Sequence, residues 1–454
     1  MTHQNPNAHD DLMRRIMAYH DQTLSIQEIQ ALEAELREDP GKRQSFIDIS
    51  LDISLIHGLL QDESHLYGST LSAPATPKHT VLIRLGAAMV TAALIVAALF
   101  LYTYVLNKPV GRLTYAKATQ WQTDSLIPND NLVLPGSYHL IQGHIRLQMN
   151  QGTVVTIGGP SQFEIQNQNS IVLTSGRIST LMAEGADPFR VHTKHLKVVD
   201  IGTAFGIQVR EDGSSHVAVF EGSVQVSSKN TSPLLLKRGD SAHTTSTGQL
   251  SPDVFNAQAF AELWPLTKGI DQMSDLVAFI PPGPQRPLTE YRHNKKLFLM
   301  PENMNLTVQD KIQVDLTPQT ADLPVQDRHP SLLQANTLSS YIVFFNGQER
   351  ETGGQHQHIQ GQITFAKPIL GVIYNEENLS KSDRPLGLKG ITYPMTHGRG
   401  LICKSPSLFP LDSITIDPDG HTIVFDLYTT EYMDQFRVIV SCDESDYSTI
   451  PGED

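Results

Sequence analysis

Two pairs of side chains in this sequence have a spacing that could serve a metal ion. His356 and His358 are separated by one residue, so on a strand both imidazoles would point to the same side and could share one ion. Their Gly- and Gln-rich surroundings favour an exposed loop instead. Asp417 and Asp419 could ligate calcium, but the sequence around them lacks the other oxygen ligands and is typical of a tight turn. We therefore predict no metal site.

Catalytic motifs are also missing from the sequence. It contains no nucleophile elbow, P-loop, dinucleotide-binding fingerprint or zinc-protease motif. Acidic residues outnumber basic ones, 48 to 34, and the net charge of −14 argues against a protein that binds nucleic acid through one broad basic face. We expect no enzymatic activity, no cofactor and no nucleic-acid partner.

The two cysteines, Cys403 and Cys442, fall in the same C-terminal region. They are either two buried thiols or a disulfide that closes a loop of about 40 residues and stabilises the region by about 4 kcal/mol. A disulfide would also require an oxidising compartment.

One segment has the composition of a membrane span. Leu85–Leu106 is 22 residues long without a charge, and Arg84 and Lys108 flank it. As a helix it would be about 33 Å long, enough to cross a hydrocarbon core of about 30 Å. We predict a single transmembrane helix, with the N-terminus cytoplasmic and residues 107–454 extracytoplasmic. The basic residues near the two ends of the span do not decide the orientation. A cytoplasmic N-terminus is favoured because the N-terminal region has no export signal and because both cysteines lie beyond the span, where an oxidising compartment would let them pair.

Residues 1–62 have the pattern of a small all-α module, followed by a linker over residues 63–84. Ser25 and Glu28 fit a capping box, and Asp39-Pro40 would end the helix that follows. The apolar side chains recur at helical spacing, which predicts either a self-contained bundle or a face kept for a partner protein. The candidate partner-binding residues are Leu32, Leu36, Phe46, Ile49, Ile53 and Ile56.

After the span the hydrophobic pattern changes to a period of two, which predicts an all-β domain over residues 107–250. Gly158-Gly159-Pro160 and Ser175-Gly176 are expected to be turns. The arrangement would be a sandwich, roll or short solenoid. The expected strands are 144–149, 153–157, 162–165, 170–173, 177–181, 189–193, 196–200, 204–209, 216–220 and 223–226.

Residues 251–287 read as a short helix at Ala257–Leu263 and a Pro-rich linker. Residues 288–454 then return to strand patterns and predict a C-terminal β-sandwich-like domain. Its expected strands are 340–345, 362–365, 369–374, 413–416, 422–427 and 435–440.

Two motifs in the first β region carry a family resemblance. Val198 to Ile207 (VVDIGTAFGI) and Val219 to Val224 (VFEGSV) resemble the signature of the FecR family. Glycine at 202 and 222 would permit tight turns, and Phe205 and Val219 would point into the core. We interpret the motif residues as structural: Asp200, Gly202, Thr203, Phe205, Phe220, Glu221 and Gly222.

FecR-like proteins are membrane proteins that relay an extracytoplasmic signal to an alternative sigma factor. The resemblance therefore implies a bacterial inner-membrane protein with an anti-sigma-like N-terminal module, periplasmic β domains and an extracytoplasmic-function-type sigma factor as partner. The periplasmic ligand or protein is not implied. The module has no cysteine, which excludes the zinc-binding form of the anti-sigma fold. The alternative is an envelope adhesion or carbohydrate-binding β protein without a transcriptional role.

Overall fold

The computed structural model forms two compact units, Met1–Leu94 and Ile95–Asp454. The residues that it describes are 15, 19, 25–38, 42, 46, 108–122, 130–183, 185–229, 231–324, 327–333, 337–347, 357–394, 398–403, 411–429 and 433–442. The predicted membrane span, Leu85–Leu106, lies outside them. Among the described helices, none has the length and the hydropathy that a bilayer crossing requires.

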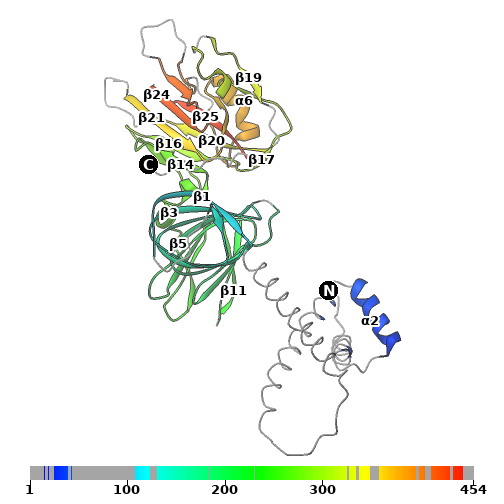
Figure 1. Cartoon of the computed structure of the whole chain (residues 1–454). Helices are drawn as coiled ribbons and strands as arrows, with labels where there is room; N and C mark the ends of the chain where they lie inside the picture. The colour runs from blue at the N-terminus through cyan, green and yellow to red at the C-terminus, as the bar shows by residue number, and fades with distance from the viewer. Residues whose placement is uncertain are drawn as a thin grey trace, which may run out of the picture. The chain divides into compact units, whose positions relative to one another are not determined.

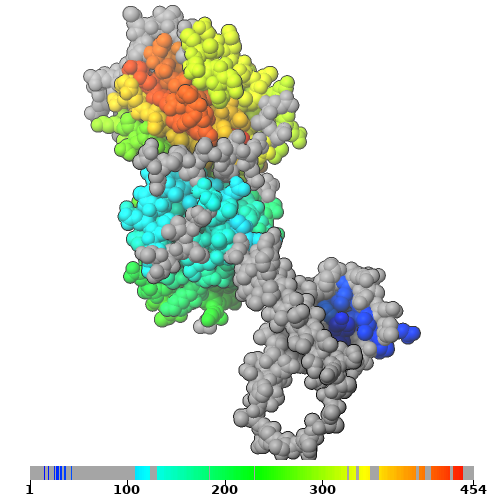
Figure 2. Space-filling view, viewed as in Figure 1, coloured from blue at the N-terminus to red at the C-terminus, as the bar shows by residue number. Residues whose placement is uncertain are grey.

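In the first unit the described helix is α2 (Ile26–Glu38). The predicted capping box is confirmed, because the Ser25 backbone N–H donates to Glu28 Oε2 at 2.8 Å. The helix ends directly before Asp39-Pro40, as the sequence predicts. Its Gln27 and Glu28 are exposed, and blue α2 residues reach the surface in Figure 2.

A first β domain follows, built on one sheet of 13 strands. Its main path runs β11-β10-β7-β6-β5-β4-β3-β1-β2, and β8, β9, β12 and β13 extend it from β5. The pairings are antiparallel apart from β5 with β6. The long strands curve (Figure 1). The strands are β1 (Gly111–Trp121), β2 (Leu132–Val133), β3 (Gly136–Met149), β4 (Val154–Asn167), β5 (Ser170–Leu181), β6 (Arg190–His192), β7 (Leu196–Asp200), β8 (Ala204–Val209), β9 (Ser215–Glu221), β10 (Ser223–Ser228), β11 (Thr231–Lys237), β12 (Ser241–Thr244) and β13 (Leu250–Asp253).

Two turns predicted in this domain are wrong. Gly158-Gly159-Pro160 lies inside β4 and Ser175-Gly176 lies inside β5, where the β4–β5 register shifts between Gly158 and Gln162. Gly176 has φ +112°, and a Cβ there would collide with the Ser161 side chain. The glycines therefore form bulges that bend two long strands, rather than turns that end four short ones.

The core of the first domain is built from the alternating inward side chains of these strands. Ile145, Ile157 and Ile178 lie in register on β3, β4 and β5 and are fully buried. Phe205 on β8 and Val219 on β9 are also fully buried in this core. Their orientation agrees with the sequence prediction.

A connector, defined here as residues 254–269, follows β13. It contains the 3-10 helix η2 (Ala257–Phe260) and the short helix α5 (Trp264–Thr267). The helix predicted at Ala257–Leu263 is shorter than expected, because only η2 lies within that range and α5 begins after it. Phe260, Leu263 and Trp264 are fully buried against the first β domain.

The second β domain consists of two main sheets, a strand pair and one longer helix. Sheet order is β14-β21-β24-β23 in one and β15-β16-β20-β25-β22, with β17 on β20, in the other. One buried cluster takes side chains from both sheets, so the domain is a sandwich. The elements are β14 (Ile270–Met273), β15 (Val277–Phe279), η3 (Leu288–Glu290), β16 (Leu297–Pro301), β17 (Leu306–Thr307), β18 (Ile312–Val314), η4 (Pro318–Thr320), β19 (Ser331–Leu333), β20 (Thr337–Phe344), β21 (Gln357–Phe365), β22 (Ile369–Ile373), α6 (Glu376–Leu386), β23 (Ser413–Ile416), β24 (Thr422–Thr429) and β25 (Gln435–Ser441).

Candidate functional site

The first turn of the sequence motif is built around a buried carboxylate. Asp200 ends β7, is fully buried and accepts a hydrogen bond from the Thr203 hydroxyl. Backbone N–H groups of Ile201, Gly202 and Thr203 also face it. Burial outweighs these donors and raises the pKa of Asp200 to about 7. The Asp200 carboxyl group therefore changes between its neutral and its charged form near pH 7.

The two glycine turns of the motif pack against each other. Gly202 and Gly222 have φ of +90° and +70°. A Cβ on Gly222 would lie 2.4 Å from the Gly202 carbonyl oxygen and 2.7 Å from Thr203 Cγ2. The β7–β8 turn therefore favours glycine at 202 for its backbone conformation, whereas the β9–β10 turn requires glycine at 222 for both conformation and space.

Phe220 and Glu221 of the motif both contact the connector. The Phe220 and Trp264 rings have centroids 4.3 Å apart, and both side chains are fully buried. Lys268 is 1% exposed, and its Nζ donates to both Glu221 carboxylate oxygens at 3.0 Å. The motif thus attaches the connector to the first β domain through one ring contact and one ion pair.

A second ion pair holds the chain just after the connector. Arg146 on β3 is 5% exposed, and its Nη1 lies 2.6 Å from Asp271 Oδ1 on β14. The Tyr115 hydroxyl donates to the Asp271 carbonyl at 2.9 Å. Since β14 belongs to a sheet of the second β domain, these contacts join the two β domains.

A cavity of about 500 Å³ lies beside this junction. Its walls come from β3, β4 and β5 of the first domain, the end of the connector, and β20 and β25 of the second domain. The charged side chains that line it are Arg146, Lys268 and Lys367. A cavity between domains with convergent polar groups is a common form of ligand site, so we take it as the candidate functional site.

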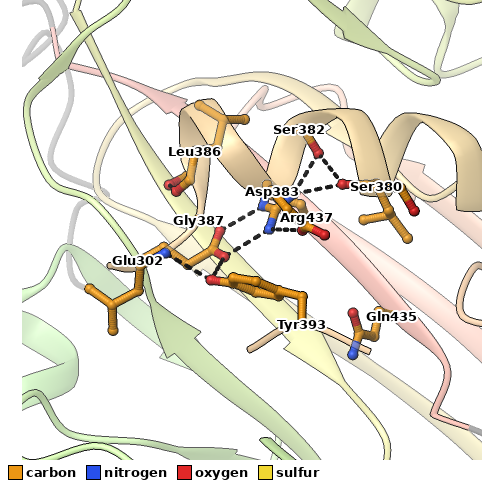
Figure 3. Close-up of polar contacts among 12 residues, drawn as sticks. Glu302, Ser380, Ser382, Asp383, Leu386, Gly387, Tyr393, Gln435 and Arg437 are labelled. Carbon is orange, nitrogen blue, oxygen red and sulfur yellow. Dashed lines mark hydrogen bonds and ion pairs between the residues drawn. The ribbon is translucent and has the colours of Figure 1, made fainter. Parts of the chain in front are cut away.

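The second β domain also contains a buried ion network (Figure 3). Arg437 on β25 contacts Glu302 at 2.7 Å and Asp383 on α6 at 3.0 Å, and Arg399 contacts the same Asp383. The Tyr393 hydroxyl donates to Glu302 at 2.5 Å, and burial raises the Tyr393 pKa. Two guanidinium groups balance two carboxylates, so the network holds α6 against the sheet.

The predicted partner-binding residues are placed only in part. Leu32 is 2% exposed and Leu36 is half-buried on α2. The half-buried Phe46 packs edge-on against Tyr19, with centroids 5.6 Å apart. Ile49, Ile53 and Ile56 lie outside the described residues.

Cys403 and Cys442 are both thiols, not a disulfide. The residue beside Cys442 bonds to Pro368 at one end of β22, whereas Leu401, two residues before Cys403, bonds to Tyr374 at the other end. Five strand residues separate these ends by about 17 Å, beyond the roughly 7 Å that a disulfide spans. The cysteines are thus two thiols, of which Cys403 is buried, as expected, and Cys442 is only half-buried. They do not support an orientation in the membrane.

The metal-ligand candidates have other roles. His358 lies on strand β21 rather than in the expected loop, bonds to Asp426 at 2.5 Å and stacks on Tyr428. The backbone carbonyl of Asp417 accepts the Gly420 N–H in the expected tight turn, while the Asp419 carboxylate accepts from the Thr422 hydroxyl. His356 lies outside the described residues.

The cavity residues gave no sequence signal. Arg146, Lys268 and Lys367 lie far apart in the chain, in strands and turns without a motif. Only the junction of two domains brings them together. One clue was available, because Lys268 follows an apolar segment in which a buried lysine needs a carboxylate partner.

Comparison with known proteins identifies one domain. Residues 141–225 match the family model described as FecR protein. No curated protein matches the chain. Two crystal structures of a candidate anti-sigma factor from Parabacteroides distasonis are similar to part of it, at 21% and 22% identity, each with a TM-score of 0.26. They cover 28% and 29% of this chain, and 64% and 65% of their own chain, which is less than two thirds.

Proposed function

Because residues 141–225 form a FecR domain, we propose that this protein is a single-pass membrane regulator that couples an extracytoplasmic signal to a cytoplasmic sigma factor. The observation that carries the proposal is the order of parts along the chain. An amphipathic helical region is followed by a 22-residue uncharged apolar segment and then by the FecR domain. In this order a candidate binding module precedes the apolar segment and a candidate sensor follows it, which supports the proposal.

In this proposal Leu85–Leu106 spans the bacterial inner membrane, residues 1–84 are cytoplasmic and the β domains are periplasmic. The sigma factor, of the extracytoplasmic-function type, binds the helical module. Leu36 and Phe46, both half-buried, belong to the face proposed for it.

The signal acts by shifting an equilibrium. A ligand or partner of the β domains changes the affinity of the module for the sigma factor only if it binds the two states of the protein with different affinities. The connector is suited to carry such a change, because it contacts the FecR motif on one side and leads directly into β14 on the other.

Affinity purification tests the proposal. The tagged full chain, extracted from its own cells in a mild detergent, should recover a sigma factor that mass spectrometry identifies. A matched chain that lacks residues 1–62 should reach the membrane but recover none. If neither chain recovers a sigma factor, the regulator proposal fails and an envelope adhesion role becomes the better account.

A further inference from the structure

Phe260 of the connector packs on a histidine of the first β domain. The rings of His216 and Phe260 are nearly parallel, at 17°, and their centroids are 6.2 Å apart. Phe260 is fully buried and His216 is 9% exposed. A Cβ on Gly206 would lie 2.7 Å from Phe260 Cδ1, so the ring also packs closely on β8. We propose that His216 is a proton-sensitive contact, which holds the connector on the first β domain at neutral pH and releases it in acid.

The groups around His216 are poorly placed to stabilise a charged imidazole. The Asp253 carboxylate on β13 faces the ring, but its Oδ2 lies 3.8 Å from His216 Nε2, which is too long for a hydrogen bond. His243 lies opposite His216 on β12, and its Nδ1 is 3.5 Å from the same Oδ2. One carboxylate oxygen thus faces two imidazoles, and Arg210 adds a cation nearby. A proton on His216 would be buried beside other cationic groups without a hydrogen bond to Asp253, which is unfavourable.

The electrostatics of His216 set the direction of the effect. Burial is the largest influence and lowers the pKa of His216, Asp253 opposes it, and Arg210 and His243 add to it. In the released state, in which His216 and Phe260 have separated, the imidazole is in water and has an ordinary pKa of about 6.5. The contact is therefore fully stabilised above about pH 6.5 and weakens as the pH falls below that value.

A cavity of about 350 Å³ lies beside this contact. Its lining includes His216 and Asp253 from the first β domain and Phe255, Asn256 and Ala259 from the connector. Asp253 is 38% exposed. A proton can therefore reach the imidazole from the cavity while the strands stay paired.

Release of the connector would alter the segment that leads from the FecR motif into β14. That the release is a signal passed to a sigma factor rests on the proposed function, whereas the release itself does not.

Hydrogen exchange of the full chain in a nonionic detergent, measured by mass spectrometry at pH 7.5 and pH 5.5, tests the proposal. The amides of Leu263 and Thr267 report the connector, because they donate to the carbonyls of Phe260 and Leu263. The comparison variant is His216→Phe, which keeps an aromatic ring and cannot take up a proton. Wild type and variant are compared at the same pH, so the pH dependence of exchange itself and the titration of Asp200 cancel.

At pH 7.5 the two proteins should exchange these amides at rates within about twofold of each other. At pH 5.5 the wild type should exchange them at least threefold and at most about tenfold faster, because a histidine of pKa 6.5 is then about tenfold more often charged than neutral. His216→Gln, which also cannot titrate, should show the same exchange at both pH values relative to His216→Phe, and it replaces that variant if the phenylalanine does not fit.

His192→Phe is the matched control. His192 is a half-buried histidine on β6 whose pKa is also lowered by burial, but it does not line the cavity. This variant should keep the acid response of the wild type. The proposal is overturned if the wild type and the His216 variants keep the same ratio at both pH values, or if His192→Phe loses the response equally. The measurement contains no sigma factor, so this proposal and the regulator proposal can fail separately.

Discussion

A buried aspartate gives the first β domain a pH dependence. The pKa of Asp200 is raised from 3.8 to about 7 by burial, so between these values the folded state keeps a proton that the unfolded state has lost. The stability due to this group is fully present below about pH 4 and is lost as the pH rises through about 7.

Asp200→Asn should remove this dependence. From pH 5 to pH 7 the variant should gain about 2–3 kcal/mol in the free energy of unfolding relative to the wild type. Urea unfolding at several pH values, followed by tryptophan fluorescence, measures the difference, because Trp121 and Trp264 lie in the first domain and its connector. A difference that stays constant with pH would show that Asp200 does not titrate in this range.

The second prediction for a single residue concerns Glu221, which forms an ion pair with Lys268. Glu221→Gln leaves the Lys268 ammonium, 1% exposed, without its charged partner. The expected cost is about 2–3 kcal/mol, at the low end for a buried pair because Glu221 itself is 42% exposed. Unfolding followed by Trp264 fluorescence reports it.

Glu262→Gln is the control for this pair. Glu262 lies in the same connector and pairs with Arg177 at 3.2 Å, but it is 64% exposed. Its loss should cost less than about 1 kcal/mol. Equal effects of the two variants would mean that the Lys268 pair contributes no more than a surface contact.

At the scale of elements, the paired glycine turns set the geometry of the FecR motif. Gly222→Ala must place a Cβ against the Gly202 carbonyl and adopt a φ of +70°. We expect a loss of about 3 kcal/mol or more, which a fall in the midpoint of urea unfolding would measure.

Gly185→Ala separates the cost of the positive φ from the cost of the steric contact. Gly185 also has a positive φ, +77°, but a Cβ there meets nothing within 4 Å. It should therefore cost only the backbone term, about 1 kcal/mol. A Gly222→Ala loss no larger than this would remove the close approach of the two turns as an explanation.

The sequence predicted strands well where polar turns or glycines bound them. The predicted ranges of β7, β8 and β23 match the structure residue for residue. It failed where glycine forms a bulge, as in β4 and β5, because a bulge and a turn have the same local composition. Helix α6 was missed because only Leu379 and Leu386 among its residues are apolar, so it has no helical periodicity.

The candidate site was harder to predict than the strands. A hydrophobic period of two predicts which face of a strand is buried, but it does not predict which residues of two different domains come into contact. Lys268 and Arg146 are 122 residues apart and line one cavity only after the connector has packed. Residues 251–287, predicted as a short helix and linker, contain strands β14 and β15 of the second domain.

At the scale of the whole molecule, the topology remains the prediction on which the regulator proposal depends. Alkaline phosphatase fused after Gly248 should be active, because it would fold in the periplasm, and fused after Asp62 it should be inactive. Colony colour and enzyme assay of the two fusions, with matched expression levels, measure this. The reverse pattern would contradict the sensor model.

The connector also bears on how this protein could have evolved. Phe220 and Glu221 contact Trp264 and Lys268, which lie about 40 residues beyond the end of the matched family region at residue 225. If recombination joined a different C-terminal domain at residue 225, Phe220 and Glu221 would lose their contacts with Trp264 and Lys268. The unit that must stay together for the FecR part to fold therefore extends past residue 225 and includes the connector up to Lys268.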